Sequence, residues 1–434
     1  MSVLEPLRHV PFRLLLAGRT VNALGNTFAP IALAFAVLDL TGSAADLGLV
    51  VGARTVVNVA FLLFGGVLAD RLPKHLLMVT ASVAAALTQG VVAALVLTGS
   101  ATIPLLIALA AINGMVAALA LPASASLLPL TVPAGARQAA NALNRLCLNG
   151  AAVVGAPLAG VVVAAIGPGY GIAVDALTFL ISAACFLPIR VPALAPALVP
   201  APGTIGGEQT PGTAAVEPSR PNILADLRTG WSEFRSRAWL WVVVAGFCVM
   251  NAAWSGGLFV LGPVVADGTI GRRAWGLVLA AQTVGMILGG LVAMRLRLRR
   301  LLFFGVVNTV FMGLPVLVLG VYPQLWALLV AGLVAGLTLE QFGIAWETTM
   351  QEHVPADKLA RVYSYDMVGS FVAIPVGEMA IGPIADLAGV EPTLLGAAAL
   401  ITASVFVMLT SRDVRALRHE MPERAPQPME ESVA

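Results

Sequence analysis

The stretch LLFGGVLADRLPKHLLMVT, residues 62–80, places charged side chains between two apolar segments. Asp70, Arg71, Lys74 and His75 lie within six residues of one another, and the flanking residues are almost wholly apolar. An α-helix needs about 20 apolar residues to cross a bilayer core of about 30 Å. The stretch therefore predicts the end of one membrane-spanning helix, a short charged loop and the start of the next.

The composition of the whole chain agrees with a membrane protein. Of its 434 residues, 59% are hydrophobic and only 11% are charged, whereas about a quarter of the residues of a soluble domain are charged. The ten-residue segments of alternating polarity that outer-membrane barrels need are absent. We therefore expect an all-α integral membrane protein. The twelve spans are expected at about 12–38, 46–69, 76–98, 102–122, 140–165, 170–188, 239–265, 275–294, 301–320, 325–349, 362–388 and 393–411.

The basic residues predict the orientation of these spans. Most of the 25 Lys and Arg residues fall in alternate connections and near the two ends, and only Arg272 and Arg273 fall in connections of the other set. Since basic loops stay on the cytoplasmic side, we expect both termini to be cytoplasmic and the protein to lie in the plasma membrane. The first apolar segment lacks a secretory cleavage site, so we expect it to be retained.

One long connection divides the chain. We expect a six-helix bundle over residues 1–188, a cytoplasmic linker over 189–236, a second six-helix bundle over 237–412 and a cytoplasmic tail over 413–434. The linker is rich in Pro, Gly, Ala and Thr, which predicts a flexible segment.

The end of the linker has a helical pattern. Leu224, Leu227, Trp231 and Phe234 recur at helical spacing. The pattern predicts an amphipathic helix, which would lie on the inner membrane surface or pack on the inner loops.

The two predicted bundles repeat each other. FGGVLADRLPKHLLM in the first half matches LGGLVAMRLRLRRLLFF in the second, with Met294 opposite Asp70, and Val-Pro precedes the fifth span of each half. Two six-span halves in parallel orientation indicate a transporter that works by alternating access.

These motifs resemble the major facilitator superfamily, and within it the twelve-span drug and metabolite exporters that include macrolide efflux proteins and the enterobactin exporter. The segments FRLLLAGRTVNALGNTF, AVLDLTGSAADLGLVVGAR, GGVLADRLPK and VPAGARQAANAL carry the resemblance, which covers about residues 8–412. It implies twelve transmembrane helices in two pseudo-symmetric six-helix bundles, and secondary active export.

The charged loop matches the superfamily pattern Gly-x-x-x-Asp-Arg-x-x-Arg/Lys through Gly66, Asp70, Arg71 and Lys74. The resemblance places span eleven beside span two, and the N-terminus of that helix would stabilise a carboxylate. We expect these four residues to form a conformational latch at the cytoplasmic face. The alternative is that the basic residues only hold the loop inside.

Three glutamates lie within predicted spans of the second half. Ionisable groups at membrane depth are expensive, and in transporters they mark functional positions. A carboxyl group removed from water binds a proton more readily, so Glu340 and Glu378, and then Glu347, are the candidates for proton coupling. The alternative for each is a static ion pair with an arginine of the first half.

The spans that line the central cavity in the superfamily contain four further candidates. Arg19, Asn22 and Asn26 share one helical face of span one, and Trp254 lies in span seven. We expect them to line the substrate cavity. Arg19 could instead form a pair or extend towards the inner surface, and Trp254 could serve only packing.

Span five contains GAAVVGAPLAG, which resembles a Gly-Pro-rich motif of the antiporter branch. Its candidate residues are Gly150, Gly155, Pro157 and Gly160. Small residues permit close helix approach and Pro permits a bend, so simple packing explains the motif equally well.

Other classes of protein find little support in the sequence. There is no Gly-x-x-x-x-Gly-Lys-Ser/Thr phosphate loop and no Cys/His cluster at metal spacing, so we expect no enzyme activity, cofactor or metal. Cys147, Cys185 and Cys248 are expected to be unpaired.

The sequence thus predicts a monomeric proton antiporter that exports an amphipathic organic compound, such as a drug or a siderophore-like metabolite. Its partners would be the small-molecule substrate, protons and the lipid bilayer, and no nucleic acid. The alternatives are a proton-coupled importer and a membrane ligand sensor that does not transport.

Overall fold

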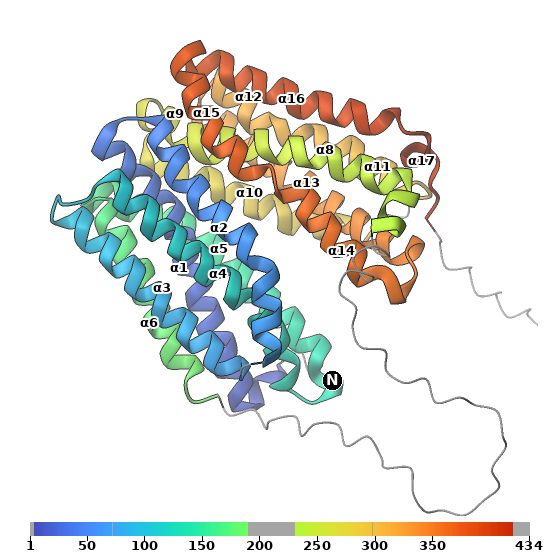
Figure 1. Cartoon of the computed structure of the whole chain (residues 1–434), viewed down its shortest axis with the longest axis horizontal. Coiled ribbons are helices and arrows are strands. Elements are labelled where there is room, and N and C mark those ends of the chain that lie inside the picture. Colours follow the sequence, from blue (N-terminus) through green and yellow to red (C-terminus); the bar gives the residue numbers. More distant parts are fainter. Residues whose placement is uncertain (1–3, 72, 190–230, 297, 420–434) are drawn as a thin grey trace, which may run out of the picture.

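The computed structural model describes residues 4–71, 73–189, 231–296 and 298–419 (Figure 1). Within these ranges every regular element is a helix. The side chains of residues 62–71, 121–123, 125, 126, 134, 356, 357, 360 and 361 lie outside the described part.

The described residues contain twelve helices, some of them interrupted, that are long and apolar enough to cross a membrane. This confirms the predicted number of spans and the all-α membrane fold. The first half contains α1 (Val10–Thr41), α2 (Ala44–Arg71), α3 (Lys74–Leu97), α4 (Ile103–Leu127), α5 (Arg137–Ile166) and α6 (Pro168–Phe186). The second half contains α8 (Ala238–Ser255), α9 (Gly262–Gly268), α10 (Arg272–Ala293), α11 (Leu301–Asn308), α12 (Leu314–Val321), α13 (Leu325–His353), α14 (Ala356–Phe371), α15 (Ile374–Ala388), α16 (Val390–Thr410) and the short α17 (Arg412–Ala416).

Three spans of the second half are interrupted. A π-helical turn, Gly256–Leu261, joins α8 to α9, a 3₁₀ turn, Thr309–Gly313, joins α11 to α12, and residues 372–373 join α14 to α15. Pro263 follows the π turn and cannot donate a backbone hydrogen bond to the preceding turn. Such π turns inside α-helices frequently mark functional positions.

The two halves meet along two helix pairs, α2 with α15 and α5 with α10. Glycine permits both contacts. A Cβ added to Gly48 would overlap with the carbonyl oxygen of Glu378, and one added to Gly276 would overlap with that of Ala156. Small residues allow membrane helices to approach this closely. Figure 1 shows the halves joined near α9 and diverging towards the end that carries the N-terminus and α14.

The described end of the linker packs on the second half. Residues 231–236 are helical, and the rings of Trp231 and Phe234 lie 5.6 Å and 5.9 Å from that of Tyr365 on α14. Leu224 and Leu227 lie outside the described residues. For the part that is described, the structure favours packing on the protein, although Trp231 remains half exposed.

Candidate functional site

Arg54 on α2 lies at the centre of the molecule, where α4 holds it in place. Its Nε donates a hydrogen bond to Oδ1 of Asn113 at 3.2 Å. One turn further along α2, Asn58 donates from Nδ2 to the carbonyl oxygen of Gly114 at 3.0 Å. Gly114 is packed directly on the backbone of Arg54, so α2 and α4 lie close together and fix the guanidinium.

A buried carboxyl group on α6, Asp175, lies within electrostatic range of Arg54. The side chain of Asp175 is fully buried. Its Oδ2 accepts a hydrogen bond from Nε2 of Gln89 at 2.6 Å, and its Oδ1 is buried with no hydrogen-bond partner. Asp175 was not among the residues predicted from the sequence, although a single acid inside the apolar run GIAVDALTF signals a functional position at membrane depth.

A second buried carboxyl group, that of Glu378, lies on α15 in the other half. Its side chain is 4% exposed, and its Oε1 accepts a hydrogen bond from Oγ of Ser255 at 2.6 Å. Its Oε2 is buried without a hydrogen-bond partner. Within the described residues Glu378 forms no salt bridge, so the static ion pair considered from the sequence is not observed.

Arg54 and Glu378 line the same cavity between the two halves, together with Gln89, which donates a hydrogen bond to Asp175. We call Arg54, Asp175 and Glu378 the central charged cluster. When both carboxyl groups are ionised, one negative charge remains unbalanced. An unbalanced charge in a medium of low dielectric constant is costly, so this arrangement can bind and release one proton.

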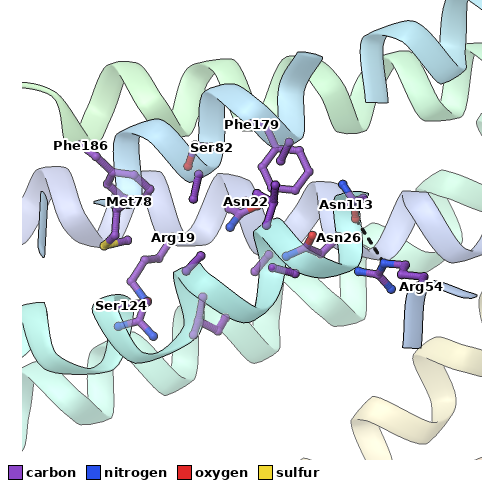
Figure 2. Close-up of a pocket in the computed structure, with 17 residues that line it drawn as sticks. Arg19, Asn22, Asn26, Arg54, Met78, Ser82, Asn113, Ser124, Phe179 and Phe186 are labelled. Carbon is purple, nitrogen blue, oxygen red and sulfur yellow. Dashed lines mark hydrogen bonds between the residues drawn. The ribbon is translucent and has the colours of Figure 1, made fainter. Parts of the chain in front are cut away.

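Two cavities lie beside the central charged cluster, and Arg54 and Asn113 line both. The first, of about 480 Å³, lies within the first half, and Arg19, Asn22 and Asn26 line it (Figure 2). The second, of about 330 Å³, lies between the halves and contains Trp254 and Glu378 in its wall. The four predicted cavity residues are therefore split between two cavities.

The other two acidic candidates lie away from these cavities. Glu340 on α13 is partly buried, and Arg145 of α5 lies within its electrostatic range. Glu347 is exposed, and its Oε1 accepts a hydrogen bond from Nε2 of Gln351 at 3.3 Å. Neither residue lines either of the two cavities, so the structure brings only Glu378 of the three to the centre.

The predicted latch falls largely on side chains that lie outside the described residues. Gly66, Asp70 and Arg71 belong to the last turns of α2, and Lys74 begins α3 and is partly buried. The backbone does place α2 beside α15, which continues span eleven. The latch remains a prediction.

The Gly-Pro-rich motif lies on α5, where it contacts both α1 and α10. Gly155 packs on Leu24 and Thr27 of α1, and Gly160 packs on the backbone of Arg272 and Arg273. Pro157 lies inside α5 beside Gly276. Gly150 is exposed with no neighbour within 4 Å of an added Cβ, so three of the four residues lie at helix contacts.

At the end where the halves join, Arg272 connects them. Its guanidinium binds Asp39 of the first half and lies 2.7 Å, from Nε to Oδ1, from Asp267. It also lies 4.8 Å from the centre of the Phe35 ring. This contact is an ionic link between the halves, and it was not predicted from the sequence.

At the other end, a smaller ionic cluster lies within the second half and the end of the linker. Hydrogen bonds from Lys358 and Arg237, each 2.9 Å, lower the pKa of Glu233 below its ordinary value.

Across the described ranges, no group of three or more His, Cys, Asp or Glu residues could hold a metal ion.

The comparisons with known proteins agree with this architecture. The family model of the Major Facilitator Superfamily matches residues 15–378. None of the curated proteins matches the chain in sequence. The chain is similar to the crystal structure of a bacterial homologue of the human lysosomal transporter Spinster, with 15% identity, 92% of this chain and 94% of that chain covered, and a TM-score of 0.63.

Two further solved structures share the fold. A mutant of the nucleoside transporter NupG is 13% identical over 92% of this chain and 99% of its own, with a TM-score of 0.69. A bacterial metal transporter is 14% identical over 94% of this chain and 99% of its own, with a TM-score of 0.62. At such identities the likeness shows the fold alone, and the family match covers most of the chain. The protein belongs to the Major Facilitator Superfamily.

Proposed function

We propose that this protein is a proton antiporter that exports an amphipathic organic compound by alternating access, as a monomer in the plasma membrane with both termini cytoplasmic. Membership of the superfamily indicates a transporter and not an enzyme. The Gly-Pro-rich motif on α5 favours export. The alternatives are a proton-coupled importer and a ligand sensor that does not transport.

The observation that carries the proposal is the central charged cluster. Asp175 and Glu378 each have one buried oxygen without a hydrogen-bond partner, and Arg54 balances only one of the two negative charges. Because the carboxyl groups belong to opposite halves, a change in protonation alters an electrostatic interaction across the interface. That is the physical link a proton-coupled transporter needs between proton binding and movement of its halves.

The arrangement of the halves supports alternating access. With the termini inside, the joined end near α9 is the outer end, and the two halves diverge towards the cytoplasm (Figure 1). This state would accept cargo from inside. Asp70, Arg71, Gly66 and Lys74 would then act as the latch that closes the inner face in the opposite state.

Transport by purified protein in liposomes tests the proposal. An imposed pH gradient and a panel of lipophilic antibiotics and catecholate siderophores would be screened for substrate-dependent proton movement. We expect proton influx coupled to substrate efflux. Movement of both in the same direction would identify an importer, and saturable binding without flux would identify a sensor.

The latch has its own test in the same liposomes. We expect Asp70→Asn to abolish transport while the protein stays folded in the membrane, because the carboxylate would no longer meet the positive end of a facing helix. Normal flux in this variant would leave the loop with a role in topology only.

A further inference from the structure

The lining of the first cavity is unusual in its charged side chains. Its described lining includes two arginines, Arg19 and Arg54, and no carboxyl group. Figure 2 shows Arg19 and Arg54 well apart, with Asn22 and Asn26 between them. The cavity therefore has one guanidinium in the central charged cluster, that of Arg54, and one apart from it, that of Arg19.

The two arginines differ in their surroundings. Arg54 is hydrogen-bonded to Asn113 and lies within electrostatic range of Asp175 and Glu378. Arg19 forms no hydrogen bond or ion pair with any described residue, although it lies within the span formed by α1 and is partly removed from water. A guanidinium at membrane depth normally has an anionic partner. Arg19 has none among the described residues, so its guanidinium is available to an anion in the cavity.

The remaining lining describes the rest of such a partner. Phe179, Phe186 and Met78 provide an apolar wall, and a cavity of about 480 Å³ is the size of a drug-like molecule. Asn22 and Asn26 add amide groups to the same lining.

We infer that the cargo is an amphipathic organic anion whose acid group binds the guanidinium of Arg19 and whose aromatic or aliphatic body lies against Phe179 and Phe186. The planar guanidinium matches a carboxylate through two parallel hydrogen bonds. This inference rests on the proposed transport function and adds the charge class of the cargo to it. Arg54 remains engaged by the carboxyl groups of the central charged cluster, so Arg19 supplies the anion site.

The experiment compares three probes of nearly equal shape: 2-naphthylacetate, its neutral amide and the cationic 2-(2-naphthyl)ethylamine. Each is titrated calorimetrically into the full-length protein in a neutral maltoside detergent. We expect the acid to bind at least tenfold more tightly than the amide or the amine. Arg19→Gln should remove this preference and leave binding of the amide unchanged.

Two further variants complete the design. Arg19→Lys should retain part of the acid preference, because it keeps the charge and loses only the paired geometry. Arg418→Gln removes the same charge from an exposed position outside the helices and should bind all three probes as the unmodified protein does. It controls for the loss of one positive charge from the protein as a whole.

The outcome is separate from that of the transport assay, because it requires neither flux nor protons. Absence of an acid preference, or a preference that persists in Arg19→Gln, would overturn the inference even if antiport of another compound were observed. An acid preference lost in Arg19→Gln would support it even if no proton movement were found.

Discussion

The two ends of the molecule differ in how the halves meet. At the joined end, α5 and α10 approach through Gly276 and Gly160, and Arg272 links Asp39 to the second half. At the diverging end, the ionic cluster around Glu233 connects only the linker end with the second half. The interface between the halves is thus concentrated at one end, as expected for one state of a protein that opens alternately to the two sides.

The largest effect is expected at the glycine contacts. A Cβ at Gly276 would overlap with the carbonyl oxygen of Ala156, and overpacking costs about 1–3 kcal/mol. Gly276→Ala should therefore reduce the population of the joined state by about 5-fold to about 150-fold. Double electron–electron resonance would measure this population, with spin labels at positions 40 and 269 in a background without the three native cysteines.

The matched control is Gly90→Ala on α3. No atom lies within 4 Å of a Cβ added there, so the distance distribution should not change. Equal distributions for Gly276→Ala and the unmodified protein would show that close packing of α5 on α10 does not hold the joined end.

A smaller effect is expected from Arg272→Gln. Its ionic contacts are partly exposed, with a fifth of the Arg272 side chain accessible, and such contacts contribute up to about 1 kcal/mol each. Only the contact with Asp39 crosses between the halves, so the joined population measured by the same labels should fall by up to about fivefold, and high salt should reduce the difference.

The neighbouring Arg273 offers the control for this prediction. Arg273 is exposed and forms no ion pair with a described side chain, so Arg273→Gln should leave the population unchanged. The ionic link would be irrelevant to the joined state if both variants behaved alike.

These contacts also show what the sequence can and cannot predict. Hydropathy and the positions of basic residues were sufficient for the twelve spans, since membrane depth requires long apolar helices. The sequence also pointed to Glu378 and to the face containing Arg19, Asn22 and Asn26, which line cavities in the structure and whose roles remain predictions. It did not identify Asp175, or the contacts of Gly276 and Arg272, because these depend on which helix faces which across the interface.

The smallest effect is expected at the diverging end. Glu233 has a lowered pKa, so its bridges to Lys358 and Arg237 stabilise the fold above the ordinary glutamate pKa of about 4.3. That contribution is lost as the pH falls through the lowered value. Glu233→Gln should lower Tm in detergent by about 1–2 °C at pH 7, and the difference should shrink towards pH 3.5. A difference independent of pH would contradict the role of the carboxylate.

The central claim is that the central charged cluster couples protons to transport. Its most direct test is substrate-driven proton movement in liposomes. The assay compares the unmodified protein with Glu378→Gln and with the control Glu391→Gln, and the control removes an exposed carboxyl group from α16. We predict that Glu378→Gln loses proton movement and still binds substrate, whereas Glu391→Gln behaves as the unmodified protein. Unchanged proton movement in Glu378→Gln would contradict the claim.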